Sequence, residues 1–295
     1  MAQHDKQPHP LDQSCLFQLS NKRKLARLLY LSPQGIEALA VVDKRYSSWN
    51  EEKKSGGIRR IDAPHENLKA VQKRIAEILQ RIVAPKYLMA PVKRRSYVNN
   101  AAAHLGARAF RLLDITDFFP SCTDKRVYWF FHDRMKCAPD IAALLTKLTT
   151  FNGYLPQGSP CSPILAYFAY ENMWGEINRI TSASGCVLSV YADDITISGD
   201  VVYERDIWAI KQCLFRFGHR YNVQKERSIV DRPADVTGVI VSHGELLLPN
   251  RQHKELTRVR REIGVTKHGR EREHLKRQLR GRRAQETQIT RHLVK

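Results

Sequence analysis

The sequence lacks any run of about 18 apolar residues that could cross a membrane, and its first residues lack the apolar segment of a secretory signal. Its six cysteines are scattered over 295 residues, and no two of them have the C-x-x-C spacing of a zinc ribbon. These absences predict reduced thiols in a cytoplasmic protein that has no membrane partner. Residues 1–19 are largely polar and contain prolines, so we expect a flexible N-terminal lead-in.

Negative charge is also scarce, because 30 Asp and Glu face 49 Lys and Arg, which gives a net charge of +19 at pH 7. Such an excess favours a polyanionic partner, most often nucleic acid, since basic side chains release the counterions condensed on phosphates. The imbalance is largest between residues 251 and 295, where 15 Lys and Arg face 5 Glu. This change of composition predicts a boundary near residue 250, followed by solvated basic helices that contact nucleic acid.

The predicted elements mix helices and strands without the strict β-α-β alternation of a doubly wound sheet. Apolar spacing and capping signals predict helices at 20–31, 33–42, 65–83, 124–136, 139–149, 164–180 and 204–220. Turn residues between short apolar runs predict hairpins at 46–64, 188–198 and 236–248, and a buried strand opens the stretch 110–121. We therefore expect an α+β fold built on an antiparallel sheet.

Two adjacent acids, Asp193 and Asp194, stand between apolar and β-branched residues that favour a strand. A hairpin turn facing water would explain the pair, and so would a metal site. Asp114 ends the strand that opens 110–121, and pairing of antiparallel strands would bring the three carboxylates together. Two Mg²⁺ ions about 4 Å apart would neutralise these acids and clamp the attacking and leaving oxygens of a phosphoryl transfer.

Three motifs, in this order and at these separations, resemble the palm motifs of reverse transcriptases: LDITDFFPS at 113–121, LPQGSPCSP at 155–163 and YADD at 191–194. The resemblance runs from about residue 20 to about residue 250. It implies an RNA-directed DNA polymerase with a right-hand fold that uses dNTPs and two Mg²⁺ ions. The implied parts are fingers at 20–105, a palm at 106–235, and a thumb with a basic RNA-binding tail at 236–295.

The resemblance also assigns catalytic roles to residues that match the family's motifs. Asp114 and Asp193 would be the principal metal ligands, and Asp194 would be the third acid. Phe119 would be the aromatic gate beneath the sugar that rejects a 2′-hydroxyl. Lys225 would protonate the pyrophosphate leaving group, the alternative being an ordinary surface lysine.

Nucleotide-binding roles fall on two further stretches. Gln157 and Gly158 would lie against the incoming nucleotide and the template, with the glycine allowing close approach of the backbone. Arg59 in GGIRRIDAP resembles the fingers arginine that holds the triphosphate, and Arg60 is the alternative. A second phosphate contact would come from Lys53 or Lys54.

Two short motifs, N-A-A-A-H at 100–104 and V-T-G at 236–238, narrow the resemblance to retron reverse transcriptases. These enzymes copy part of their own structured noncoding RNA into single-stranded DNA. Asn100 and His104 would contact the RNA or support such a contact, and the second motif assigns RNA binding to Val236, Thr237 and Gly238.

The retron resemblance implies a cognate RNA and its DNA product as partners, together with an effector protein and an antiphage role. Two alternatives stay open at this point. One is another bacterial reverse transcriptase, either intron-encoded or diversity-generating, and the other is an RNA-binding scaffold that kept the fold without catalysis.

Overall fold

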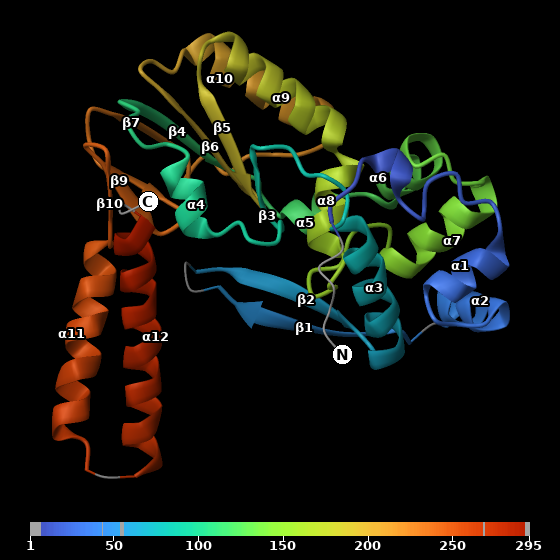
Figure 1. Cartoon of the computed structure of the whole chain (residues 1–295), viewed down its shortest axis with the longest axis horizontal. Coiled ribbons are helices and arrows are strands. Elements are labelled where there is room, and N and C mark those ends of the chain that lie inside the picture. Colours follow the sequence, from blue (N-terminus) through green and yellow to red (C-terminus); the bar gives the residue numbers. More distant parts are fainter. Residues whose placement is uncertain (1–6, 43, 54–55, 268, 293–295) are drawn as a thin grey trace.

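The computed structural model of the chain describes residues 7–42, 44–53, 56–267 and 269–292. Helices and strands are mixed along the chain, which confirms the expected α+β class. Figure 1 shows a helical body around the N-terminal half, a central sheet, and a pair of long C-terminal helices that project away from it. None of the helices within the described ranges has the length and apolar character needed to span a membrane.

The helical body forms because amphipathic helices bury their apolar faces in one large core. In α3 (Glu66–Leu79), Leu68, Ile75 and Leu79 recur at helical spacing and are at most 1% exposed. The predicted helices at 20–31 and 33–42 are confirmed with shorter bounds, and the one at 139–149 is confirmed with the predicted bounds. The helix predicted at 124–136 is α6, which continues into a π-helical turn at Phe130–Arg134. The remaining helices of this body are α1 (Lys22–Leu28), α2 (Pro33–Val41), α5 (Phe118–Ser121), α6 (Asp124–Trp129), α7 (Pro139–Thr149) and α8 (Ser162–Ala169).

A five-stranded sheet in the order β3-β5-β6-β4-β7 lies at the centre of the molecule. The pairs β4–β6, β4–β7 and β5–β6 are antiparallel, as expected. The expectation of an antiparallel sheet is wrong at one edge, where β3 pairs with β5 in parallel, because the connection between them is no hairpin but a long one that runs through β4 and several helices. The strands are β3 (Leu88–Ala90), β4 (Ala109–Asp114), β5 (Val187–Tyr191), β6 (Asp194–Gly199) and β7 (Arg227–Val230).

Two helices, α9 (Glu171–Ala183) and α10 (Glu204–Arg216), lie together over one face of this sheet (Figure 1). The single helix expected at 164–180 is in fact two helices, α8 and α9, because the chain leaves helical geometry at Tyr170 (φ −120°, ψ 23°). The buried Tyr170 hydroxyl donates to the Ser121 carbonyl at 3.1 Å, which holds this break against α5. The break therefore helps to position the segment that follows β4.

A two-stranded hairpin, β1 (Tyr46–Glu52) and β2 (Ile58–Pro64), extends from the helical body with most of its residues exposed. Gly56 and Gly57 close its turn at φ of 84° and 85°, which is the left-handed conformation that glycine adopts without strain. The hairpin predicted at 46–64 is confirmed.

The C-terminal quarter of the chain builds a second, smaller core. Val236, Leu256 and Ile289 are at most 3% exposed and pack with Val98 of α4, so the basic helices beyond residue 250 are anchored along one side. Figure 1 shows the two long helices of this unit running side by side. Its elements are α4 (Tyr97–Ala102), β8 (Ala234–Val236), β9 (Val239–Ser242), β10 (Glu245–Leu247), α11 (Asn250–Val265) and α12 (Arg270–His292).

The prediction of a flexible lead-in is wrong for residues 7–19, while residues 1–6 lie outside the described residues. Leu16 and Leu19 are buried in the large core, and the His9 backbone forms a parallel bridge with Ile82. The segment begins with polar residues, which indicated disorder, but it also contains apolar residues. The free energy gained by burying these apolar side chains outweighs the conformational entropy lost on ordering a short stretch.

Candidate active site

Pairing of β4 with β6 brings the three predicted acids together. Asp114, the last residue of β4, is the ladder partner of Asp194, and the Ile115 backbone N–H donates to the Asp193 carbonyl at 3.0 Å. Ala192 closes the β5–β6 hairpin with φ of 58°, a conformation that costs of order 1 kcal/mol for a residue with a Cβ. The strands on both sides hold this turn, so the acids sit on a rigid support.

Burial and mutual repulsion disfavour the charged forms of these carboxylates. Burial raises the pKa of Asp193 above its usual range, and the neighbouring Asp114 adds to the shift. The pKa of Asp194 is raised to about 7, chiefly by burial and then by Asp193 and Asp114. A cation bound here would relieve the repulsion.

Lys225 supplies positive charge at this site. Its Nζ donates to Asp114 Oδ2 at 2.7 Å, and this bond, more than the nearby charges, raises the pKa of the lysine. Within the described part of the chain, no three His, Cys, Asp or Glu side chains are arranged as a ready metal-ligand cluster. The donors nevertheless suit a hard divalent cation, because they are carboxylate oxygens whose charges are only partly compensated.

Among the arginines proposed for the triphosphate, Arg59 lies near enough to the acids for its charge to offset a small part of the upward shift in the pKa of Asp193. Arg60 is committed elsewhere, since its Nε donates to Asp62 Oδ1 at 2.9 Å. Lys53 Nζ lies 3.7 Å from Asp117 Oδ1, so the turn end of the β1–β2 hairpin reaches the segment after β4. Lys54 lies outside the described residues.

The loop at 155–163 meets the same hairpin. Gln157 accepts a hydrogen bond at its carbonyl from the Asp62 backbone N–H at 2.8 Å. Gly158 has φ of 132°, and a Cβ there would lie 2.9 Å from the Asp62 carbonyl oxygen. The close approach that this glycine permits is therefore to the hairpin backbone.

Asp62 is a site residue that the sequence reasoning missed. It is 1% exposed, and its carboxylate accepts from Ser48 Oγ at 2.6 Å and from the Tyr154 hydroxyl at 3.2 Å, besides Arg60. It joins the hairpin to the loop that precedes α8. An acid set between the apolar residues Ile61 and Ala63 is the signal in IDAP that could indicate it, because a carboxylate placed there needs hydrogen-bond partners.

The two aromatic residues that follow Asp114, Phe118 and Phe119, differ in their exposure to solvent. Phe118 is 5% exposed and packs its ring 6.3 Å from that of Trp174, centroid to centroid. Phe119 is partly exposed, with its ring centroid 5.6 Å from that of Phe118. The ring of Phe119 thus packs against the buried ring of Phe118 and keeps accessible surface for a ligand.

The two short motifs at 100–104 and 236–238 lie against each other. Asn100 Nδ2 donates to Thr237 Oγ1 at 3.1 Å, and Thr237 Oγ1 donates to the Tyr97 carbonyl at 3.3 Å. Gly238 has φ of 87°, and its N–H donates to Asp235 Oδ1 at 2.9 Å. The structure therefore joins residues 137 positions apart in the chain into one turn.

Burial limits what these residues can do. Asn100 and His104 are 0% and 1% exposed, so of the two expected roles only support of an RNA contact is compatible with the structure. Val236 is 0% exposed in the second core, which corrects its assignment as an RNA-binding residue, because its side chain is fully enclosed. Thr237 and Gly238 retain accessible surface.

The environment of His104 predicts a pH dependence of stability. Its ring nitrogens hydrogen-bond to Ser198 Oγ and Ser189 Oγ at 2.7 Å each, and burial lowers its pKa to about 4. The unfolded chain, with an ordinary histidine pKa near 6.5, binds the proton more readily. Stability is therefore lost as pH falls from about 6.5 to about 4, by about 3 kcal/mol at most.

Urea unfolding of the wild type and of His104→Gln across this pH range measures the effect. The comparison is needed because Asp194, with its raised pKa, acts in the opposite direction in both proteins. His219 also has its pKa lowered to about 4, mainly by burial, and it too is common to both. Wild-type stability should fall relative to that of the variant, and parallel curves would contradict the assignment.

Comparison of the sequence with known proteins finds one family whose model covers the residues of this site. The family model described as Reverse transcriptase (RNA-dependent DNA polymerase) matches residues 51–241. The retron Se72 reverse transcriptase of Salmonella heidelberg (strain 579083-10) is 33% identical over 207 residues, which are 66% of this chain and 55% of that protein. The retron Ec86 reverse transcriptase of Escherichia coli is 27% identical over 247 residues, 81% of this chain and 76% of that protein.

The retron Mx65 reverse transcriptase of Myxococcus xanthus is 29% identical over 221 residues, 68% of this chain and 52% of the relative. The chain thus spans about half the length of the Se72 and Mx65 proteins and about three quarters of the Ec86 protein. The matched residues include the three acids, the loop at 155–163 and most of the β1–β2 hairpin. On this agreement between motifs, geometry and family model, the chain belongs to the reverse transcriptase family.

Proposed function

We propose that this chain is an RNA-directed DNA polymerase of the retron type, which copies part of a structured noncoding RNA into single-stranded DNA. The observation that carries the proposal is the register that makes Asp114 and Asp194 ladder partners, with Asp193 in the adjoining turn. The similarity to three retron enzymes supports the retron type. The cognate RNA, its DNA product and dNTPs are the partners that follow from it.

The proposed architecture is a right hand, with fingers at 20–105, a palm at 106–235 and a thumb at 236–295. The five-stranded sheet under α9 and α10 fits a palm, and the exposed β1–β2 hairpin beside it fits the fingers. The pair α11 and α12 fits a thumb that carries the basic tail, since its exposed faces hold most of that tail's arginines and lysines.

In this proposal the acids Asp114, Asp193 and Asp194 hold two Mg²⁺ ions. When bound, these ions activate the primer 3′-hydroxyl and stabilise charge on the leaving pyrophosphate. Arg59 and Lys53 bind the triphosphate from the hairpin side.

The remaining residues orient the nucleotide and move a proton. Phe119 packs beneath the sugar, and Gln157 lines the nucleotide side of its loop next to Gly158. Lys225 carries at Nζ the proton that the pyrophosphate takes up, and it leaves its bond to Asp114 to do so.

RNA recognition is proposed for the second core and the basic helices. Thr237 and Gly238 present accessible surface, while Asn100 fixes the turn that carries them. Structured RNA is read largely by shape, phosphate and 2′-hydroxyl contacts, so a rigid turn next to basic helices is suited to it. The effector protein and antiphage role rest on the retron resemblance alone.

The test is to purify the protein from its native locus and sequence the nucleic acid that accompanies it. A linked or base-paired hybrid of a short structured RNA and its single-stranded DNA copy is the expected result. An intron RNA or a variable-repeat transcript would instead identify another kind of reverse transcriptase. RNA binding without dNTP incorporation on any primed template would identify a scaffold.

The proposed gate gives a separate prediction. Phe119→Ala should raise incorporation of ribonucleotides relative to deoxyribonucleotides by at least about tenfold, because the ring no longer fills the space that a 2′-hydroxyl would need. Single-nucleotide extension with each nucleotide class measures the ratio. Phe215→Ala, which removes a half-exposed ring of α10, is the matched control and should leave the ratio unchanged.

A further inference from the structure

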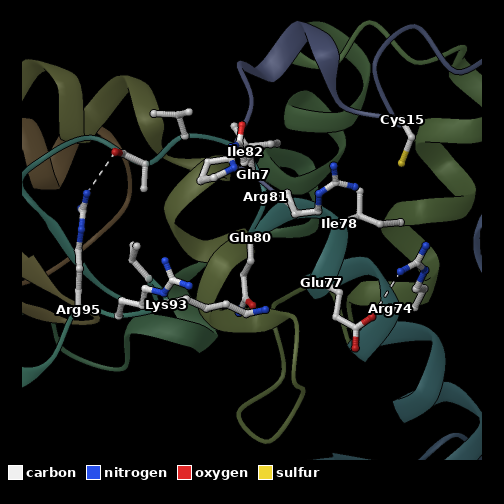
Figure 2. Close-up of a pocket in the computed structure, with 15 residues that line it drawn as sticks. Gln7, Cys15, Arg74, Glu77, Ile78, Gln80, Arg81, Ile82, Lys93 and Arg95 are labelled. Atoms are coloured by element: carbon white, nitrogen blue, oxygen red, sulfur yellow. Dashed lines mark hydrogen bonds and ion pairs between the residues drawn. The ribbon is translucent and has the colours of Figure 1, made fainter. Parts of the chain in front are cut away.

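A pocket of about 640 Å³ lies in the helical body, and none of the proposed catalytic or nucleotide-binding residues lines it. Its walls are the C-terminal end of α3 with the residues that follow, the N-terminal segment, and the loop before α4. Figure 2 shows the side chains around it, with Arg95 on one side and Arg74 on the other. A volume of this size is typical of pockets for small ligands.

The walls are held by hydrogen bonds, so the pocket is part of the built structure. The His9 N–H donates to the Arg81 carbonyl at 2.9 Å, and the Val83 N–H donates to the His9 carbonyl at 2.9 Å. On the opposite wall, Arg95 Nη1 donates to the Pro85 carbonyl at 2.5 Å and also to the Leu88 carbonyl. Arg95 is thereby committed to the fold.

The charge of the lining is strongly positive. It contains one acid, Glu77, and five basic residues, Arg74, Arg81, Lys93, Arg94 and Arg95. Glu77 is already engaged, because Arg74 Nη1 donates to its Oε2 at 3.4 Å while Arg74 Nε donates to the Leu28 carbonyl. Of the five basic residues, Arg81 and Lys93 have no ion pair within the described residues, so these two present positive charge to a ligand.

Arg81 is the group that the protein itself leaves unsatisfied. Its Nε is buried and has no hydrogen-bond partner among the residues that the structure describes. A buried donor without a partner costs free energy, so the Arg81 guanidinium is not committed to the fold and would gain from pairing with an anion. Lys93 is exposed on the facing loop and supplies a second cation.

The rest of the lining is apolar. Val83 is 58% exposed although it lines the pocket, and Ile78, Ile82, Ala84 and Val92 continue this surface. An apolar floor next to unpaired cations matches a ligand with a flat apolar part and a phosphate. A nucleotide has both parts, because its base can pack on aliphatic side chains while its phosphate pairs with cations.

We propose that this pocket binds one nucleotide, with its phosphate at Arg81 and Lys93 and its base against Val83 and Val92. The nucleotide comes either from a bound single strand or from the free nucleotide pool, and the chemistry of recognition is the same for both. The site is separate from the polymerase centre, so it holds even where the proposed polymerase activity does not.

Binding assays on the full-length protein without dNTPs or Mg²⁺ test the site. The probes are a fluorescein-labelled 12-nucleotide single-stranded RNA and, separately, a fluorescent ADP analogue. The double variant Arg81→Gln/Lys93→Gln should weaken binding of at least one probe by about tenfold or more. The control Arg23→Gln/Lys69→Gln removes the same charge from exposed positions and should change binding less than about twofold.

Which probe loses affinity in the pocket variant distinguishes a nucleotide of a bound strand from a free nucleotide. Loss for the RNA alone identifies a nucleotide of a bound strand, and loss for the ADP analogue identifies a free nucleotide. The proposal is overturned if the pocket variant and the control variant lose the same binding affinity for the probes, or if neither variant loses any. Lys93→Glu, at an exposed position that does not endanger folding, repeats the test and should weaken the same probe more than Lys93→Gln does.

A map of contact sites adds a second readout. Cross-linking with the same RNA carrying 4-thiouridine should label residues 78–95 in the wild type, and the label should be lost in the pocket variant. Labelling confined to the basic helices beyond residue 250 would contradict the proposal.

Discussion

Asp193→Asn is expected to lower Mg²⁺-dependent dNTP incorporation by on the order of 10³-fold or more, while the protein stays folded. The amide keeps the shape of the side chain but removes a charged metal ligand. Stability should be unchanged or higher, because burial and the neighbouring Asp114 already raise the pKa of Asp193 and so disfavour its charged form. Primer extension on an RNA template and urea unfolding measure the two effects.

The matched control for this variant is Asp200→Asn, an acid at an exposed position just after β6. It removes the same charge a few residues away and should retain near wild-type incorporation. Full activity in Asp193→Asn, or in the double variant with Asp114→Ala, would rule out the proposed metal-dependent centre.

Gly158→Ala is expected to destabilise the protein by about 2 kcal/mol or more. The residue has φ of 132°, and the new Cβ would meet the Asp62 carbonyl oxygen at 2.9 Å, which is backbone and cannot swing aside. Relief requires the β1–β2 hairpin to move away from the loop at 155–163. Incorporation should fall as well, because Arg59 and Lys53 are carried on that hairpin.

Gly175→Ala is the matched control, since it adds the same methyl group inside α9 where nothing lies within 4 Å. It should stabilise the protein by up to about 1 kcal/mol, as alanine is the better helix former. Urea midpoints compare the two. A Gly158→Ala protein as stable and active as the control would show that the hairpin and loop are not coupled through this contact.

The convergence of the three acids could be predicted from sequence because part of its signal is local. Asp193 and Asp194 interrupt an apolar stretch and Asp114 ends another, so periodicity places each at a strand end, while the proposed catalytic role came from the resemblance of the motifs. Pairing of those strands then needed only the usual antiparallel register, which the structure has. The α+β class followed for the same reason.

What could not be predicted depends on contacts between distant parts of the chain. Nothing within IDAP or LPQGSP indicates that the Asp62 backbone packs on Gly158. Burial of Asn100 and His104 likewise depends on strands that come more than 80 residues later. The packing of the N-terminal segment could not be predicted because Leu16 and Leu19 are buried in a core whose other members are distant in sequence, and their carbonyls accept from Cys137 and Ala138.

The second core has a consequence for the order of folding. Tyr97 in α4 donates its hydroxyl to Gln288 Oε1 across 191 positions, and Ile289 is buried in the same core. Contacts at such sequence separation form late, because the long loop must close before they are gained. During synthesis, the core around the turn that joins 100–104 to 236–238 therefore stays incomplete until α12 has emerged, by which time the five-stranded sheet can already have formed. A nascent chain would bring its three paired acids together first and complete its proposed RNA-recognition surface last.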